Sequence, residues 1–348
     1  MRPWRPPPAS TRPDSRLPCR GRPARSRRSP TRSWSTIALP SYDARVRLVD
    51  SLIARSLPAV PRPLVRRFAD RYIAGEATAD AVNSVRALNG RRLMATLAVL
   101  GEFVEDGGQA DETLQRYLEL LSAVFEERLD ANVSVKPSAL GLLIDPPGAR
   151  QRTRQLVESA ARLGTFVRID MEDSQLTDAT LELYRGLRQE GHENVGIVLQ
   201  SRLKRSLADI DALARLAPNV RLVKGIYIEP AEIAHSDPAL INRALLRMLE
   251  RLLDGGSYVA VASHDEAVLA GAQALLRERA VPPDRYEFQT LLGVRDELRD
   301  RLLAAGHRVR VYVPFGEQWY EYSLRRLQEN PSLAGYVATD AVRSLVGR

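Results

Sequence analysis

The chain contains a single cysteine among its 348 residues, so no disulfide bond can form within it. It also lacks any run of 18 or more apolar residues, which argues against a helix that spans a membrane. Nothing in the cysteine content requires an oxidising compartment. From these two absences we expect a cytoplasmic protein.

Short motifs that carry chemistry by themselves are missing as well. The four histidines are scattered, without the HxH, HExxH or CxxC spacing of a zinc site, so we expect no metal. Neither GxGxxG nor GxxxxGK occurs, which argues against Rossmann and P-loop nucleotide sites. The GxSxG elbow of many serine hydrolases is also absent. Any active site must therefore be assembled by the fold from distant residues.

Positive charge is concentrated in residues 1–36, which hold ten Arg, eight Pro, one Asp and no Lys. This segment carries +9 and the whole chain +8, so residues 37–348 carry about −1. A Pro- and Arg-rich segment with few apolar residues cannot build a core, and we expect a disordered basic tail. An arm for nucleic acid or an anionic membrane is the weaker alternative, and no nucleic-acid partner is expected.

Eight short apolar runs, rich in Val and Ile, recur in the remaining chain at the spacing of one strand plus one helix. Runs that are apolar almost throughout indicate strands buried on both faces, as in parallel sheets covered by helices. The segments between them have apolar residues at helical spacing opposite charged faces. The runs are 95–102, 133–139, 165–172, 195–201, 220–227, 258–265, 286–292 and 309–314.

This alternation predicts an α/β fold, a (βα)8 TIM-type barrel, in which the C-terminal ends of the strands surround one active site. We assign the barrel to residues 95–348 and expect a helical segment over 37–94 before it. A final helix is expected over the barrel mouth. Polar residues in or beside the ends of the runs are the first candidates for the site, namely Glu102, Lys136, Asp170, Gln200, Lys224, His264, Gln289 and Tyr312.

The segment EQWYEYSLRRLQEN after the eighth run has the pattern of a helix with a charged face. On an isolated helix such a face would simply be solvated. Close to a barrel mouth, two adjacent guanidinium groups can instead hold a carboxylate bidentately. The residues that share this face, at i, i+3, i+4 and i+7, are Tyr322, Arg325, Arg326 and Glu329.

Charges within the apolar runs admit several interpretations. Lys136 and Asp170 end consecutive runs and could form a buried ion pair, or be a Schiff-base or loop lysine and a helix-capping acid. Arg221 lies inside an apolar run, where an unpaired charge is costly, and this favours a functional role. Strict alternation places Arg221 and Lys224 on opposite faces of the strand. His264 fits either core packing or a cofactor contact.

Several segments together resemble the proline dehydrogenase family and occur in the family's order over residues 95–331. The segments RLVKG and YxxRR are specific in combination, although each alone is weak. As they stand here, the matching pieces are SVKPSAL, RIDMED, GIVLQ, RLVKGIYIEP, ASHD, YEFQTLLG, VRVYVPFGE and YEYSLRR.

The resemblance implies a distorted (βα)8 barrel that binds FAD and oxidises L-proline to Δ1-pyrroline-5-carboxylate, with hydride passing to flavin N5. This is the first step of proline catabolism to glutamate. Family members usually pass electrons to membrane quinone, so loose membrane association is expected. The oligomeric state stays open. Arg202 and Leu292 stand where the family commonly has aromatic residues, which puts the packing of the pocket in doubt but not the activity.

The resemblance also assigns roles to individual residues. Asp170 and Arg221 are the expected catalytic residues, with Asp170 paired to Lys136 and Arg221 beside flavin N5. Arg325 and Arg326 would hold the proline carboxylate, and Glu329 would brace an arginine. The complete set of expected substrate contacts is Lys136, Leu222, Tyr312, Tyr322, Arg325, Arg326 and Glu329. The expected flavin contacts are Met171, Gln200, Lys224, Gly225, Ile226, Tyr227, Ser263 and His264.

Two other hypotheses remain open. A Schiff-base aldolase that uses Lys136 or Lys224 rests on fold analogy alone, and one fold hosts many activities. A binding protein without catalysis would act through residues 1–36, and salt-dependent binding in the absence of any flavin would favour it.

Overall fold

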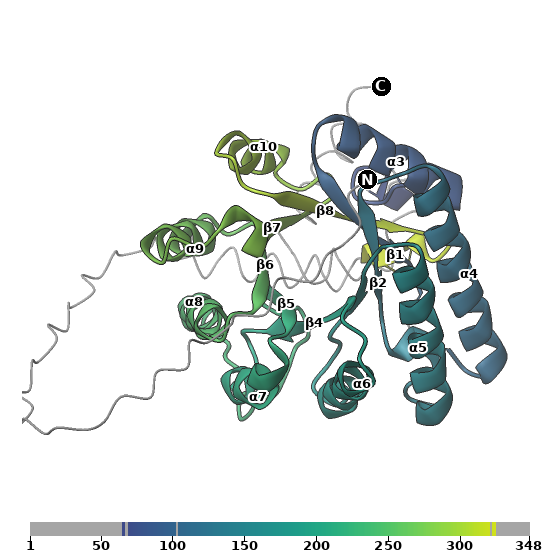
Figure 1. Cartoon of the computed structure of the whole chain (residues 1–348), viewed down its shortest axis with the longest axis horizontal. Coiled ribbons are helices and arrows are strands. Elements are labelled where there is room, and N and C mark those ends of the chain that lie inside the picture. The colour runs from purple at the N-terminus through teal and green to yellow at the C-terminus, as the bar shows by residue number, and fades with distance from the viewer. Residues whose placement is uncertain (1–64, 67–68, 102–103, 321, 325–348) are drawn as a thin grey trace, which may run out of the picture.

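The computed structural model describes residues 65–66, 69–101, 104–320 and 322–324. Eight parallel strands follow one another in sequence order and close into a barrel, with the helices on its outside (Figure 1). The last strand, β8 (Val309–Phe315), pairs with the first, β1 (Met94–Val99), which completes the ring. The predicted (βα)8 barrel is therefore confirmed.

Each predicted apolar run overlaps one strand, and most strands are shorter than the runs. Gln289 and Tyr312 lie inside their strands, whereas Lys136, Asp170, Lys224 and His264 lie just beyond theirs. The other strands are β2 (Ala131–Val135), β3 (Val167–Ile169), β4 (Val195–Gln200), β5 (Asn219–Val223), β6 (Tyr258–Ala262) and β7 (Tyr286–Leu291).

The helices between the strands often begin at an aspartate that accepts a hydrogen bond from a backbone N–H of the first turn, as at Asp106, Asp145, Asp237 and Asp265. They are α4 (Gly107–Glu126), α5 (Pro146–Arg162), α6 (Thr177–Gln189), α7 (Ser206–Leu213), α8 (Pro238–Asp254), α9 (Glu266–Glu278) and α10 (Asp296–Ala304). Short 3-10 turns occur at Ser138–Leu140, Ala214–Leu216 and Pro283–Arg285.

One further helix, α3 (Thr78–Gly90), precedes the first strand and packs against β1 and β8. It falls within the helical segment predicted over 37–94. The predicted tail, residues 1–36, lies outside the described residues, as does most of the predicted final helix. Within the described part of the chain, no helix has the length and apolar character needed to cross a membrane.

The hydrophobic core lies between the barrel and its helices. Val133, Ile169 and Val220 are fully buried and alternate with residues that point into the barrel. They pack with fully buried residues of the helices, such as Leu156 of α5 and Leu245 of α8. This outer layer explains why the strands look apolar in sequence.

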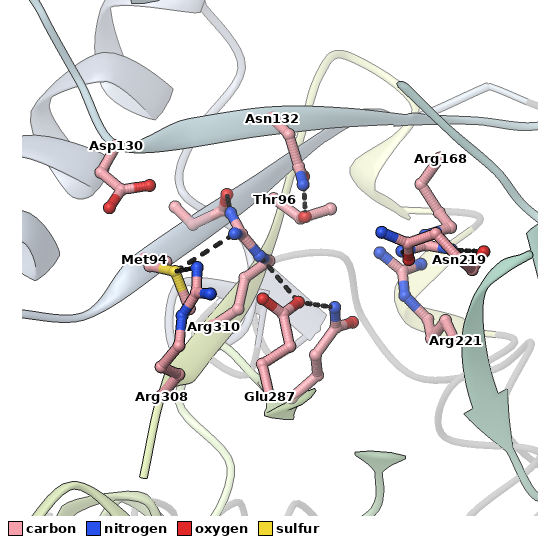
Figure 2. A network of polar contacts seen from close by, with 12 residues as sticks. Met94, Thr96, Asp130, Asn132, Arg168, Asn219, Arg221, Glu287, Arg308 and Arg310 are labelled. Carbon is pink, nitrogen blue, oxygen red and sulfur yellow. Dashed lines mark hydrogen bonds and ion pairs between the residues drawn. The ribbon is translucent and has the colours of Figure 1, made fainter. Parts of the chain in front are cut away.

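The inner face of the barrel is polar, which the apolar runs did not predict. Arg310 of β8 and Glu287 of β7 form a buried ion pair, with 2.9 Å between Nε and Oε1 (Figure 2). Arg310 also donates to the backbone oxygen of Ala95, and Gln289 and Tyr258 donate to the Glu287 carboxylate. These residues come from β1, β6, β7 and β8, so the network ties four neighbouring strands together from inside.

Burial alone would raise the pKa of Glu287, but the charge and hydrogen bond of Arg310, with help from Gln289, lower it to about 2. A carboxylate with a depressed pKa stabilises the folded state above its unfolded value of 4.5. That stabilisation is lost as the pH falls from 4.5 towards 2.

Glu287→Gln removes the counter-ion of a fully buried arginine, and we expect it to lower the free energy of unfolding by about 3–5 kcal/mol. The matched control is Glu127→Gln, because Glu127 pairs with Arg86 at 2.9 Å on the surface, where a loss of about 1 kcal/mol or less is expected. Urea denaturation measures both. The difference between wild type and Glu287→Gln should shrink between pH 4.5 and 2. Equal losses in the two variants would contradict the importance of the inner pair.

Candidate functional site

Asp170 forms the centre of a polar cluster at the C-terminal mouth of the barrel. Its Oδ1 accepts hydrogen bonds from Arg221 Nη1 at 2.7 Å and from Ser134 Oγ at 2.8 Å. Its Oδ2 accepts from Tyr312 Oη at 3.3 Å. The four residues come from β2, β5, β8 and the end of β3, so only barrel closure brings them together.

Arg221 points into the barrel and is almost fully enclosed, with 4% of its surface exposed. Its guanidinium group lies over the ring of Tyr312, 5.3 Å from the ring centre. Two of its nitrogens, Nε and Nη2, are buried and have no hydrogen-bond partner among the described residues. Buried donors of this kind are costly unless a ligand satisfies them. The arrangement therefore fits a ligand with hydrogen-bond acceptors at the mouth.

A second cluster joins the end of β4 to the loops after β2 and β3. Gln200 Nε2 donates to the backbone oxygen of Glu172 at 2.6 Å, while Gln200 Oε1 is buried without a partner in the described part of the chain. The Glu172 carboxylate accepts from the backbone N–H and the hydroxyl of Ser138. Gln200 thus presents a free acceptor next to loops held in place by Glu172.

Gly225 is required at its position beside Gln200. Its φ of +93° lies in the left-handed region, and a Cβ there would meet Gln200 Oε1 at 2.5 Å. The glycine lets the chain after β5 pass close to the end of β4.

Lys224 binds Asp265, with 2.6 Å between Nζ and Oδ2, and Asn242 donates to the same oxygen. Burial alone would raise the pKa of Asp265, but hydrogen bonds from Lys224 and Asn242 lower it. Ser263 Oγ accepts from the backbone N–H of Asp265. His264 Nε2 accepts from the backbone N–H of Leu291 at 3.0 Å, so the neutral ring carries its proton on Nδ1. The segment after β6 is therefore held in place by hydrogen bonds.

The other residues expected to contact the flavin or the substrate differ in burial and in location. Met171 and Tyr322 are buried, and Tyr322 packs with Ala69, Ile73 and Leu100. Ile226 is 41% exposed. The backbone oxygen of Tyr227 accepts from Arg202 Nη1 at 2.8 Å, which gives Arg202 a role in shaping the loop. Arg325, Arg326 and Glu329 lie outside the described residues.

Leu222 is placed differently from expectation. Arg221 points into the barrel, so strand alternation turns Leu222 outwards, into the fully buried core beneath the helices. This position argues against the expected contact with a substrate. The ion pair described for Asp170 is with Arg221, and the expected pairing of Asp170 with Lys136 stays a prediction.

Three residues of the site were missed in the sequence. Ser134 precedes Lys136 by two residues, and this spacing on a strand places both side chains on the same face. The sequence could therefore have indicated Ser134. Tyr117, on α4, donates from Oη to the backbone oxygen of Ser134 and accepts from the backbone N–H of Val99. Burial raises the pKa of Tyr117, so its hydroxyl stays protonated. Tyr117 carries no sequence signal, because its role depends on a contact between distant elements, whereas Glu172 ends the run 165–172 and lies within RIDMED.

Residues 81–339 match the family model described as proline dehydrogenase. The chain belongs to the proline dehydrogenase family. It is 36% identical over 303 residues to the proline dehydrogenase of Deinococcus radiodurans, covering 83% of this chain and 98% of that protein. It is 35% identical over 269 residues to proline dehydrogenase 1 of Bacillus subtilis, covering 77% of this chain and 89% of that protein.

A solved structure supports the fold. Proline utilization A from Bdellovibrio bacteriovorus is similar with a TM-score of 0.73 at 23% identity, over 82% of this chain and 37% of that chain. The chain thus spans little more than a third of the length of that protein, and the likeness concerns the fold alone.

Asp170→Asn would leave Arg221 buried without a counter-ion, and we expect a loss of about 3 kcal/mol in the free energy of unfolding. Ser134→Ala removes a hydrogen-bond donor but keeps the ion pair, and a loss of about 1 kcal/mol is expected. Chemical denaturation of both variants tests the difference. A smaller loss for Asp170→Asn than for Ser134→Ala would show that the ion pair does not dominate the cluster.

Proposed function

We propose that the protein is a FAD-dependent proline dehydrogenase, which oxidises L-proline to Δ1-pyrroline-5-carboxylate at the barrel mouth. Membership of the family supports the activity. The observation that carries the proposal is Arg221: a buried guanidinium held by Asp170, with two donors that have no partner among the described residues.

The polar groups at the mouth fit the edge of an isoalloxazine ring, which has both hydrogen-bond acceptors and an N–H donor. Arg221 offers donors and Gln200 offers an acceptor, each buried and without a partner in the described structure. Gly225 leaves room for close approach beside Gln200. When bound, FAD supplies the two-electron acceptor that amino-acid side chains lack. We assign its binding to Met171, Gln200, Lys224, Gly225, Ile226, Tyr227, Ser263 and His264.

The substrate would lie against the same mouth. Arg325 and Arg326 hold its carboxylate in our proposal, with Lys136 as a third cation and Glu329 bracing an arginine. Tyr312 and Tyr322 flank the ring. Fixing the carboxylate would hold the C5–H bond in one orientation for hydride transfer to bound FAD, which is catalysis by orientation. Tyr312 donates a hydrogen bond from Oη to Asp170, which supports its place beside the substrate in this proposal.

Asp170 and Arg221 act electrostatically in this proposal. With FAD bound, the Arg221 cation would stabilise negative charge on the cofactor, and Asp170 keeps the guanidinium oriented. The neutral secondary amine of proline is the reactive form, so the rate rises with pH as a group deprotonates. Membrane quinone is the proposed electron acceptor, with loose membrane association of a cytoplasmic protein.

The Schiff-base alternative is disfavoured by a specific contact. A Schiff-base lysine needs an amine that is free to attack a carbonyl carbon, whereas Lys224 Nζ is held by Asp265 Oδ2 at 2.6 Å. Lys136 would be the lysine left for that chemistry.

The absorption spectrum of the purified protein tests the proposed activity. We expect the bands of oxidised flavin, which L-proline bleaches in the absence of oxygen, whereas D-proline should not. A colourless protein that stays inert after reconstitution with FAD would overturn the proposal.

Arg325→Met and Arg326→Met each remove a charge-assisted contact to the substrate carboxylate. A loss of about 2–5 kcal/mol in binding corresponds to an affinity for proline that is weaker by about 30-fold or more. Flavin content should stay at the wild-type level, because neither residue is among the proposed flavin contacts. Titration of proline against flavin reduction measures the affinity, and unchanged titration curves would place both arginines outside the substrate site.

A further inference from the structure

A second arginine, Arg168 of β3, directs its guanidinium group beneath the Asp170–Arg221 pair. This group binds Asn219, which precedes Arg221 by two residues on β5 and so lies further from the mouth. Arg168 is 2% exposed. Figure 2 shows Arg168 and Arg221 in the same part of the barrel interior, apart from the Glu287–Arg310 pair.

Arg168 forms no ion pair with any carboxylate of the described residues. Its Nη1 donates to the backbone oxygens of Ile197 at 3.0 Å and Asn219 at 2.7 Å, and its Nη2 donates to Asn219 Oδ1 at 2.5 Å. The guanidinium also lies 5.0 Å from the ring centre of Phe166. All these partners are neutral, so the positive charge of Arg168 is solvated by dipoles and has no paired counter-ion, and Glu287 acts on it only through space.

The barrel is shaped to accept this charge. A Cβ on Gly196 would collide with Arg168 Nη1 and with the backbone oxygen of Asn219, so glycine makes the space. Burial, and then the like charge of Arg221, lower the pKa of Arg168 to about 9, which leaves it protonated at neutral pH. A buried charge without a paired counter-ion opposes folding, so packing alone does not account for it.

We propose that Arg168 is a positioning residue whose buried positive charge, beneath Arg221, raises the positive potential at the barrel mouth. The charge repels the Arg221 guanidinium towards the mouth, where Asp170 and the unpartnered donors of Arg221 lie. It also stabilises any negative charge placed there. This inference rests on the proposed flavin chemistry, in which electrons arriving at the flavin increase its negative charge. Arg168 would then make the bound flavin easier to reduce without touching it.

The experiment uses the flavin-loaded full chain and three variants. Arg168→Met removes the charge, Arg168→Gln removes the charge but keeps a hydrogen-bond donor for Asn219, and Arg168→Lys keeps the charge. Two properties are measured besides turnover: the midpoint potential of the flavin, and the dissociation constant of sulfite, whose adduct at flavin N5 is anionic. The melting temperature is recorded in parallel.

Arg168→Met and Arg168→Gln should have a more negative midpoint potential and bind sulfite on the order of 10-fold more weakly, because each variant removes a buried positive charge that favours an anionic flavin. Arg168→Lys should remain close to the wild type in both properties. The melting temperature of Arg168→Met should not fall if its charge opposes folding. If Arg168→Met does not fold, the inference is tested by comparing the midpoint potential and sulfite affinity of Arg168→Gln with those of Arg168→Lys.

A potential and a sulfite affinity that stay unchanged in the neutral variants, with flavin still bound, would overturn the inference and leave the proposed function intact. Equal changes in the Lys and Gln variants would also overturn it, because they would indicate hydrogen bonding rather than charge. A wild-type protein that binds no flavin would overturn the proposed function, and this inference with it.

Discussion

The ion pair between Asp170 and Arg221 is the interaction on which the site depends. Both side chains are largely buried, and the 2.7 Å contact joins the end of β3 to β5 across the barrel. Ser134 and Tyr312 donate to the same carboxylate, so β2 and β8 are drawn into the cluster. Without Asp170, Arg221 would be a buried cation without a carboxylate among the described residues. The same pair sets the direction of the donors that a ligand can use.

Burial of the apolar layer outside the barrel offsets the free-energy cost of burying polar groups inside it. Strand residues such as Val133 and Ile169 are fully buried against the helices, and this burial is the main stabilising contribution. Inside, the charges are arranged in depth. Glu287 and Arg310 neutralise each other near the floor, Arg168 is surrounded by neutral dipoles, and Asp170 pairs with Arg221 at the mouth. The polar residues inside the barrel thus lie beneath the site and help to hold its side chains in place.

Much of the fold could be predicted because strand burial on the outer face leaves a strong local pattern. All eight runs overlap strands, and the polar ends of several carry residues of the mouth, Asp170 among them. The sequence did not predict that Leu222 faces the helices, although the inward direction of Arg221 implies it. Gln289 was expected at a strand end, but it lies within β7 and donates to Glu287.

The sequence by itself determined the succession of strands and helices, since apolar periodicity is a local property, and its motifs indicated the family. Only the tertiary structure decided which charges meet. Arg221 binds Asp170, 51 positions earlier in the chain, and Arg168 binds Asn219 over the same separation. Tyr117 reaches the mouth from a helix. Such partners are chosen by barrel closure and strand register, which bring distant residues into one layer and are not encoded in any short segment.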